Sequence, residues 1–343
     1  MDHHGPMPAA RISAGGPERR PSRERRGSRL RRTDRFDPRT RSRSTWIPGR
    51  VPLAPLEPEW LIVDHLPMFH RFHRPAEPAA AETIVHVHGF GISGTYLEPT
   101  AAVLAARYPT FVPDLPGMGR SMRPRHGLDL PGLARALVSY FDAVGVEKPI
   151  VVGNSLGCPV IIELAASFPD RVKSAVLVSP AGGPNNQPLG RALHQMAQDG
   201  LREPVSMLPI ATRDYLRFGA LQSLSLFKAM TRYPTLANLH LLDVPTLVIA
   251  GARDPLVNIS RAFVLAALPH VTAVRVPGAH ALNFSAPELI AELIDAHLTE
   301  SPLFGGVHAR GIAEAVEVSA GDAPTVSRAE RRARTDHARR TAH

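Results

Sequence analysis

The chain contains a single cysteine, Cys158, among 343 residues. One thiol cannot form an intramolecular disulfide, and it gives no sign of a thiolate metal site. The sequence also lacks an H-E-x-x-H motif and a strand-linked G-x-G-x-x-G turn followed by an acidic residue. These absences favour a protein that uses no metal, no dinucleotide and no other cofactor. The low cysteine content suits a cytoplasmic location.

No run of about 18 apolar residues occurs, so no transmembrane helix is predicted. The net charge of +9 is unevenly distributed, because residues 1–50 hold 14 Arg against five Asp and Glu. Residues 51–300 hold 19 basic and 21 acidic side chains and are close to neutral. Arguments for binding nucleic acid therefore apply only to the arginine-rich segment.

Residues 1–50 are rich in Arg, Pro, Ser and Gly and poor in large apolar side chains. Such a segment cannot bury enough apolar surface to offset the entropy lost on ordering, so we expect a disordered N-terminal arm. We expect the same of the C-terminal tail, residues 301–343. The arm is interpreted as a solvated tail, and a contact with nucleic acid or an acidic membrane is the alternative.

Residues 60–298 alternate between strand-like and helix-like segments. Eight strands are predicted, at 60–64, 68–73, 83–88, 110–113, 150–153, 172–178, 246–250 and 272–276, with an antiparallel pair at the start. Helices are predicted at 96–106, 130–144, 156–167, 259–267 and 287–298, with Asp129 as the N-cap of the second. Helical connections between strands produce right-handed crossovers, so the pattern predicts an α/β fold with a mainly parallel, eight-stranded sheet.

One interval breaks this alternation. Residues 183–242 contain no strand-like segment, but three helix-like pieces at 189–198, 213–219 and 221–231. An insertion of this length at the carboxyl edge of a sheet is typical of a functional lid. We therefore expect a first core segment at 51–182, a helical lid at 183–242 and a second core segment at 243–300.

The segment Gly153-Asn154-Ser155-Leu156-Gly157 follows an apolar, β-branched strand and precedes a helix. A sharp strand-to-helix turn strains its central residue and leaves room only for small neighbours, which accounts for the two glycines. The turn presents the Ser155 hydroxyl at the carboxyl edge of the sheet, beside a helix N-terminus that favours negative charge. Ser155 is the candidate nucleophile.

A serine hydroxyl needs a base, and the base needs a partner that holds its tautomer. Asp254 follows the seventh predicted strand and His280 follows the eighth. In a parallel sheet these positions share one edge with Ser155. Asp254 and His280 are therefore the candidate acid and base.

Other residues of the same types are less well placed. Asp243 and His270 precede the seventh and eighth strands, and His297 lies late in the last helix. None of the three should reach the serine. Cys158 is interpreted as a small packing residue on the helix after the turn.

The chain resembles serine hydrolases of the α/β-hydrolase fold, over about residues 60–298. Four motifs carry the resemblance, in order along the chain: His88-Gly89-Phe90-Gly91, the sequence D-L-P-G-M-G-R-S at residues 114–121, the serine turn, and the loops of Asp254 and His280. The chain order Ser, Asp, His is that of this family. The related branches include esterases, carbon–carbon-bond hydrolases and cofactor-free haloperoxidases.

The resemblance implies a role for each matching residue. Ser155 is the nucleophile, His280 the general base and acid, and Asp254 the carboxylate that orients the histidine. The main-chain N–H groups of Leu156 and Phe90 form the oxyanion hole. His88, Asp114 and Ser121 are expected to support their loops by hydrogen bonding.

The lid is rich in apolar side chains, which suggests an apolar acyl or ring group in the substrate. The candidate substrate-binding residues are Phe90, Tyr215 and Phe218. Arg213 and Arg217 share a face if their segment is helical, and form either a solvated face or a site for a substrate carboxylate.

These patterns predict a hydrolase whose substrate is a small molecule. The expected substrate is a small to medium, apolar carboxylic ester, which is cleaved through an acyl-enzyme on Ser155. One alternative is hydrolysis of a carbon–carbon bond beside a ketone. Another is a binding protein on a catalytically silent hydrolase fold.

Overall fold

The computed structural model describes residues 53–75, 82–218, 220–257 and 268–299. The predictions for the N-terminal arm, the C-terminal tail and the helix at 259–267 lie outside the described residues. Within the described ranges, no helix has the length and apolar character that crossing a bilayer requires.

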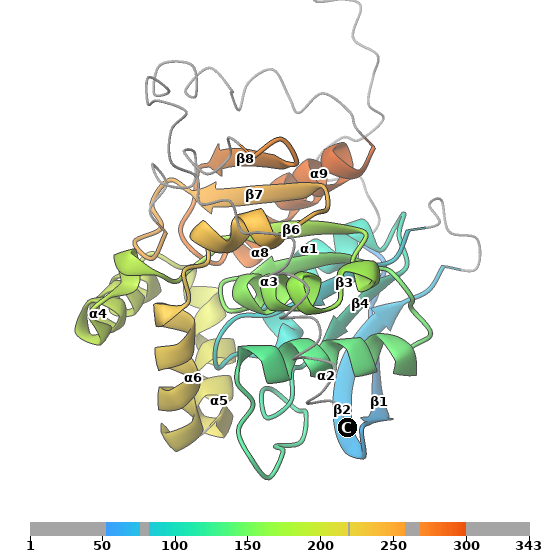
Figure 1. Cartoon of the computed structure of the whole chain (residues 1–343), viewed down its shortest axis with the longest axis horizontal. Helices are drawn as coiled ribbons and strands as arrows, with labels where there is room; N and C mark the ends of the chain where they lie inside the picture. The colour runs from blue at the N-terminus through green and yellow to red at the C-terminus, as the bar shows by residue number, and fades with distance from the viewer. Residues whose placement is uncertain (1–52, 76–81, 219, 258–267, 300–343) are drawn as a thin grey trace, which may run out of the picture. The chain divides into compact units, whose positions relative to one another are not determined.

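Eight strands form one sheet (Figure 1), in the order β1-β2-β4-β3-β5-β6-β7-β8. The pairs β1–β2 and β2–β4 are antiparallel, and all neighbouring pairs from β4 to β8 are parallel. The α/β fold, the number of strands and the antiparallel start are confirmed. The strands are β1 (Glu57–Val63), β2 (Leu66–His73), β3 (Ile84–Val87), β4 (Thr110–Pro113), β5 (Ile150–Asn154), β6 (Ser174–Val178), β7 (Thr246–Gly251) and β8 (Val271–Val276).

Helices cover both faces of the sheet. One core cluster joins α2 and α3 to strand residues such as Val85 and Val151. The other joins α1, α8 and α9 to the alternating residues, such as Ile84 and Ile150. Because both faces are covered, the inner strands are apolar at nearly every position. These helices are α1 (Glu98–Leu104), α2 (Leu130–Ala143), α3 (Gly157–Ser167), α8 (Leu282–Ser285) and α9 (Pro287–Leu298).

The ends of two helices test the expected boundaries. The Asp129 side chain accepts a hydrogen bond from the Gly132 N–H at 2.8 Å, so the predicted N-cap of α2 is confirmed. The helix predicted at 96–106 is instead a 3₁₀ turn, η1 (Gly94–Leu97), followed by α1. Pro99 in the first turn of α1 is tolerated because its missing N–H would have no partner inside the helix.

The described residues between β6 and β7 contain helices and no strand. They form η3 (Pro184–Asn186), α4 (Leu189–Gly200), η4 (Val205–Met207), α5 (Leu208–Phe218), α6 (Ala220–Arg232) and η5 (Ala237–Leu241). The helix predicted at 213–219 is therefore the second half of a longer one. Figure 1 shows α4, α5 and α6 on the side to which the arrowheads of β7 and β8 point. The helical insertion thus lies at the carboxyl edge of the sheet.

Candidate active site

Ser155 occupies the sharp turn between β5 and α3. Its φ of +55° lies in the left-handed region, which costs a non-glycine residue about 1–3 kcal/mol. The Ser155 N–H donates to the Val178 carbonyl at 3.1 Å, and the Ser155 carbonyl accepts from the Cys158 N–H at 3.0 Å. These main-chain hydrogen bonds from β6 and α3 hold the strained turn in place.

The glycines on either side of the turn are required by close packing. A Cβ at Gly157 would lie 2.3 Å from the Val87 carbonyl oxygen in β3. A Cβ at Gly153 would lie 2.6 Å from the Ile161 side chain in α3. The turn therefore fits between β3 and α3 only because both positions lack a side chain.

Asp254 follows β7 and His280 follows β8, and their side chains are hydrogen bonded. His280 Nδ1 lies 2.7 Å from Asp254 Oδ2. The other Asp254 oxygen accepts from the Leu256 N–H at 2.8 Å, and the carboxylate is 0% exposed. Because a carboxylate only accepts, the Nδ1 of His280 carries the proton. This leaves Nε2 as the basic nitrogen.

His280 Nε2 is buried and has no hydrogen-bond partner in the described part of the chain, so it does not bond Ser155. The two residues nevertheless line the same cavity, of about 390 Å³. Hydrogen bonds between a nucleophile and its base are often long in a ligand-free site and shorten when substrate binds. In the neutral ring of His280, Nε2 is the nitrogen that can accept a proton.

Three carboxylates act on the protonation of His280. Burial disfavours the charged imidazolium, but Asp254, Asp199 and Glu203 more than offset this and raise the pKa of His280 to about 9. Asp199 is itself 8% exposed, and burial raises its pKa to about 6. The site therefore stabilises the imidazolium that forms when the histidine accepts a proton.

A polar link that the sequence did not predict connects three parts of the site. The Asn154 side-chain amide donates to the carbonyls of His280 and Val178, at 3.2 Å each. The Asn154 oxygen accepts from the Tyr96 hydroxyl at 2.7 Å, and that hydroxyl accepts from the Gly89 N–H at 2.7 Å. The link joins the serine turn to the histidine loop and to the loop after β3. The place of Asn154 beside the serine was the only signal in the sequence.

Two main-chain N–H groups, those of Phe90 and Leu156, have no acceptor in the described part of the chain. Leu156 is the N-cap of α3, and Phe90 lies in the loop after β3 and lines the cavity. Both groups are available to an anionic oxygen.

The aromatic residues expected to bind substrate are placed differently from one another. Phe90 and Tyr215 line the cavity, but Phe218 does not. Phe218 is 4% exposed and packs edge-on against Phe90, with ring centres 5.3 Å apart. Phe218 thus contacts Phe90, which lines the cavity, and is not itself among the lining residues. Gly91, at φ +68°, allows the Tyr215 ring to approach, because a Cβ there would lie 2.6 Å from it.

The arginines of α5 do not reach the cavity. Arg213 Nε donates to the adjacent Asp214 at 2.8 Å, and its guanidinium also reaches Ser93 Oγ at 3.3 Å. Asp214 in turn accepts from the Ser93 N–H at 2.8 Å. Neither Arg213 nor Arg217 lines the cavity, so the structure gives no support to a carboxylate site at this pair.

His88 supports the loop after β3, as expected. Its Nε2 accepts from the Leu115 N–H and its Nδ1 donates to the Gly89 carbonyl, both at 2.8 Å. These bonds require the neutral ring, and burial lowers the pKa of His88 accordingly. With both ring nitrogens occupied, His88 cannot serve as the base.

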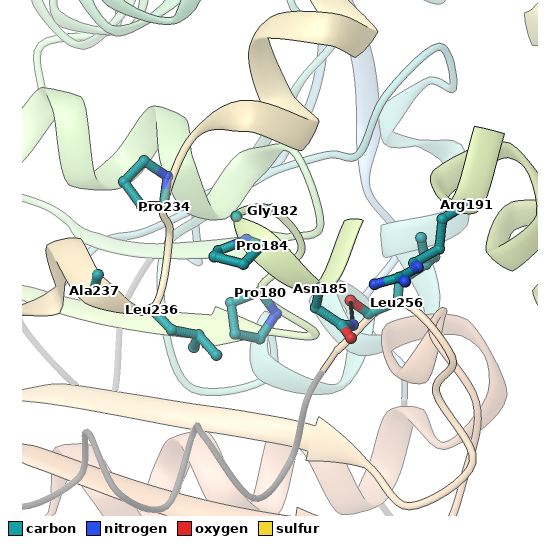
Figure 2. A pocket seen from close by; sticks show the side chains of 10 residues that line it. Pro180, Gly182, Pro184, Asn185, Arg191, Pro234, Leu236, Ala237 and Leu256 are labelled. Carbon is teal, nitrogen blue, oxygen red and sulfur yellow. Dashed lines mark hydrogen bonds between the residues drawn. The ribbon is translucent and has the colours of Figure 1, made fainter. Parts of the chain in front are cut away.

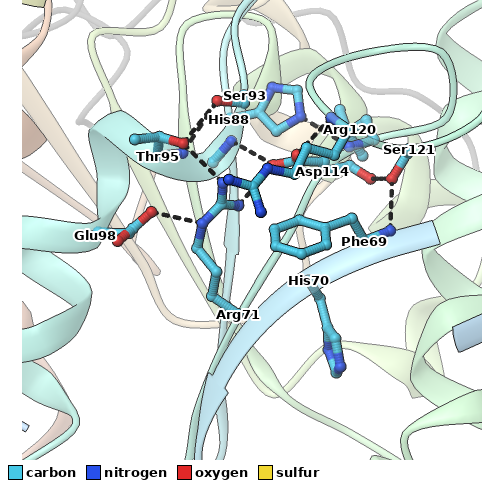
Figure 3. A network of polar contacts seen from close by, with 12 residues as sticks. Phe69, His70, Arg71, His88, Ser93, Thr95, Glu98, Asp114, Arg120 and Ser121 are labelled. Atoms are coloured by element: carbon cyan, nitrogen blue, oxygen red, sulfur yellow. Dashed lines mark hydrogen bonds and ion pairs between the residues drawn. The ribbon is translucent and has the colours of Figure 1, made fainter. Parts of the chain in front are cut away.

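Asp114 supports the loop after β4 in the same way (Figure 3). Its fully buried carboxylate accepts from the Arg71 guanidinium and from the N–H groups of Gly94 and Arg120, each at 2.8 Å. The Ser121 hydroxyl donates to the Asp114 carbonyl at 2.6 Å. The expected role of Asp114 and Ser121 is confirmed.

The rival residues lie away from the serine turn. His270 precedes β8, and His297 Nε2 lies 3.1 Å from the Ser174 hydroxyl near the amino end of β6. Asp243 precedes β7, at the opposite edge from Ser155. Cys158 is buried, and burial raises the pKa of its thiol, so it is a packing residue.

A second cavity, of about 240 Å³, lies between the β6–α4 and α6–β7 connections (Figure 2). Among the described residues that line it, Arg191 is the only charged side chain, and no serine, cysteine or histidine is present. This cavity has no groups for nucleophilic catalysis.

Comparison with known sequences gives a consistent result. A family model described as the alpha/beta hydrolase family matches residues 84–293. The acetyltransferase component of the acetoin cleaving system of Cupriavidus necator is 38% identical over 102 residues, which cover 30% of this chain and only 27% of that protein. A putative carbamate hydrolase, RutD, of Pseudomonas syringae is 28% identical over 68% of this chain and 100% of its own length.

Comparison with solved structures supports the same fold. Carboxylesterase CesB (YbfK) from Bacillus subtilis superposes with a TM-score of 0.59 at 21% identity, covering 71% of this chain and 92% of its own. At this identity the likeness shows the arrangement of the strands and helices.

Proposed function

Because the chain belongs to the alpha/beta hydrolase family, we propose that it is a serine hydrolase that cleaves a small to medium, apolar carboxylic ester. The observation that carries this proposal is the Asp254–His280 hydrogen bond at the wall of a cavity that Ser155 also lines. A nucleophile, a base with a free Nε2 and a carboxylate that fixes its tautomer are the groups that acyl transfer requires.

In the proposed mechanism, Ser155 Oγ attacks the carbonyl carbon of the ester while its proton moves to His280 Nε2. The oxygen that becomes negative accepts hydrogen bonds from the N–H groups of Phe90 and Leu156. His280 then returns the proton to the departing alcohol. Water, deprotonated by the same Nε2, attacks the acyl carbon of the acyl-enzyme. Nε2 then returns this proton to Ser155 Oγ as the bond between Oγ and the acyl carbon breaks and the acid leaves.

The cavity suits an apolar substrate of modest size. Its volume of about 390 Å³ lies within the usual range of small-molecule sites. The insertion, residues 183–242, supplies much of its wall, in agreement with the proposed role as a lid. The apolar wall residues include Met196, Leu201, Met207, Leu208, Ala211 and Met230.

Charge favours an ester over a substrate that carries a carboxylate. No Lys or Arg occurs among the described residues that line the cavity, whereas Asp199 and Glu203 do. A carbon–carbon-bond hydrolase that recognises a carboxylated ketone would need a cation there. The expected substrate therefore carries no negative charge.

A fluorophosphonate tests the proposal directly, because it reacts with a serine only when a base activates it. We expect the wild-type protein to be labelled at Ser155 and to hydrolyse p-nitrophenyl butyrate, and we expect Ser155→Ala to do neither. A folded wild-type protein that takes no label and cleaves none of a panel of esters, lactones and amides would overturn the proposal. That result would favour the alternative, a binding protein on a catalytically silent hydrolase fold.

A further inference from the structure

The start of the helical insertion is hydrogen bonded to both loops that carry the candidate acid and base. We name residues 185–203, which include α4, the α4 segment. Toward the loop of Asp254 this segment presents donors. The Asn185 amide donates to the Leu256 carbonyl at 2.9 Å, the bond drawn in Figure 2, and Gln195 donates to the Pro255 carbonyl at 2.8 Å.

Two further donors complete these contacts. The Asn186 amide also donates to the Leu256 carbonyl, at 3.0 Å, and Arg202 donates to the Arg253 carbonyl at 2.6 Å. The main-chain carbonyls on both sides of Asp254 are thus held by side chains of the α4 segment.

Toward the loop of His280 the α4 segment presents acceptors. Glu203 Oε1 accepts from the main-chain N–H groups of His280 and Ala281, at 2.8 and 2.7 Å. Asp199 Oδ1 accepts from the same His280 N–H at 3.2 Å. These N–H groups lie past the end of β8 and have no strand partner, so a side-chain acceptor fixes their direction.

We propose that the α4 segment positions the catalytic pair, with Glu203 as the positioning residue for His280. This inference rests on the proposed hydrolase function. Glu203 acts on the main chain of His280, and so sets where the imidazole lies between Asp254 and Ser155. An error of about 1 Å in the position of a reacting group can cost about a hundredfold in rate.

Variants of Glu203 separate geometry from charge. Glu203→Gln keeps an acceptor oxygen at the same reach and loses the charge. Glu203→Asp keeps the charge but is one methylene shorter, and Glu203→Ala loses both. Gln198→Ala is the matched control, because Gln198 lies on the same helix and, among the described residues, its side chain bonds only to His194 of that helix.

The readouts are the rate of fluorophosphonate labelling of Ser155, and kcat and KM for p-nitrophenyl butyrate at the pH-independent limit. We expect Glu203→Ala and Glu203→Asp to lose at least about tenfold in labelling rate and kcat, with KM within about threefold of wild type. Gln198→Ala should stay within about threefold in all three quantities. Glu203→Gln, which keeps an acceptor oxygen at the same reach, should lose less in labelling rate and kcat than either Glu203→Ala or Glu203→Asp. A larger loss of labelling rate and kcat in Glu203→Asp than in Glu203→Gln is a result that a merely structural carboxylate would not produce.

Thermal unfolding of each variant accompanies these assays. Folded Glu203→Ala and Glu203→Asp proteins that react at the wild-type rate would overturn the positioning role, and so would failure of both to fold, which would make the contact purely structural. A wild-type protein that takes no label is a different result, because it removes the hydrolase function itself.

Discussion

The Nδ1 atom of His280 lies 2.7 Å from Oδ2 of Asp254, whose other oxygen accepts the N–H of Leu256. The Asp254 carboxylate is thus held both by the main chain of its own loop and by the histidine. This arrangement determines which nitrogen of His280 carries the proton. It also keeps a negative charge next to the imidazolium.

The first prediction concerns this carboxylate. Asp254→Asn should fold, because the remaining oxygen still accepts the Leu256 N–H, but it should lose at least about a hundredfold in kcat for p-nitrophenyl butyrate. The amide removes the charge that stabilises the imidazolium and permits the wrong tautomer. Steady-state kinetics and thermal unfolding check both parts. Turnover within about tenfold of wild type would assign the acid to another residue.

The second prediction concerns pH. Protonated His280 cannot act as a base, and its pKa is raised to about 9, so kcat/KM should increase with pH toward a midpoint at about 9. Glu203→Gln removes one of the carboxylates that raise this pKa, so its midpoint should lie at lower pH. Rate profiles from about pH 6 to about pH 10.5 measure both midpoints. A midpoint for Glu203→Gln at or above the wild-type value would contradict the electrostatic account.

The third prediction concerns the charge of the substrate. The kcat/KM for p-nitrophenyl butyrate should be at least about tenfold higher than that for the p-nitrophenyl monoester of glutaric acid. The reason is that Asp199 and Glu203 repel the free carboxylate of the glutaric monoester. The double variant Asp199→Asn, Glu203→Gln should reduce the difference in kcat/KM between the two esters. Equal rates for the two esters in the wild-type protein would show that the cavity does not select against anions.

The fourth prediction concerns stability. Asp114→Ala leaves the buried Arg71 guanidinium without this partner and removes the acceptor of the Gly94 and Arg120 N–H groups. Loss of one member of a buried ion pair typically costs about 3–5 kcal/mol in the free energy of unfolding. Urea unfolding measures this loss.

The control for Asp114 is an exposed ion pair. Asp142 is 65% exposed and pairs with Arg171 at 2.6 Å. Asp142→Ala should change the free energy of unfolding by about 0–1 kcal/mol. If Asp114→Ala were no more damaging than Asp142→Ala, the buried network would not stabilise the loop after β4.

The amino-acid sequence by itself determined the sheet and the chain order of the three candidate residues. The run at 150–153 is apolar and β-branched, and Asp129 precedes a helical pattern with Pro131 in its first turn. Such signals are local, because strand and helix periods and caps depend on neighbours a few positions away. The edge shared by Ser155, Asp254 and His280 followed from the direction of the strands alone.

Tertiary structure decided which side chains meet across that edge. Tyr215 and Phe218 are three positions apart on α5, yet one lines the cavity and the other packs behind Phe90. Glu203 and His280 are 77 positions apart, and no periodicity relates them. Both outcomes depend on how α4 and α5 fold back onto the carboxyl edge of the sheet. That placement results from the packing of the whole insertion, which local sequence patterns do not encode.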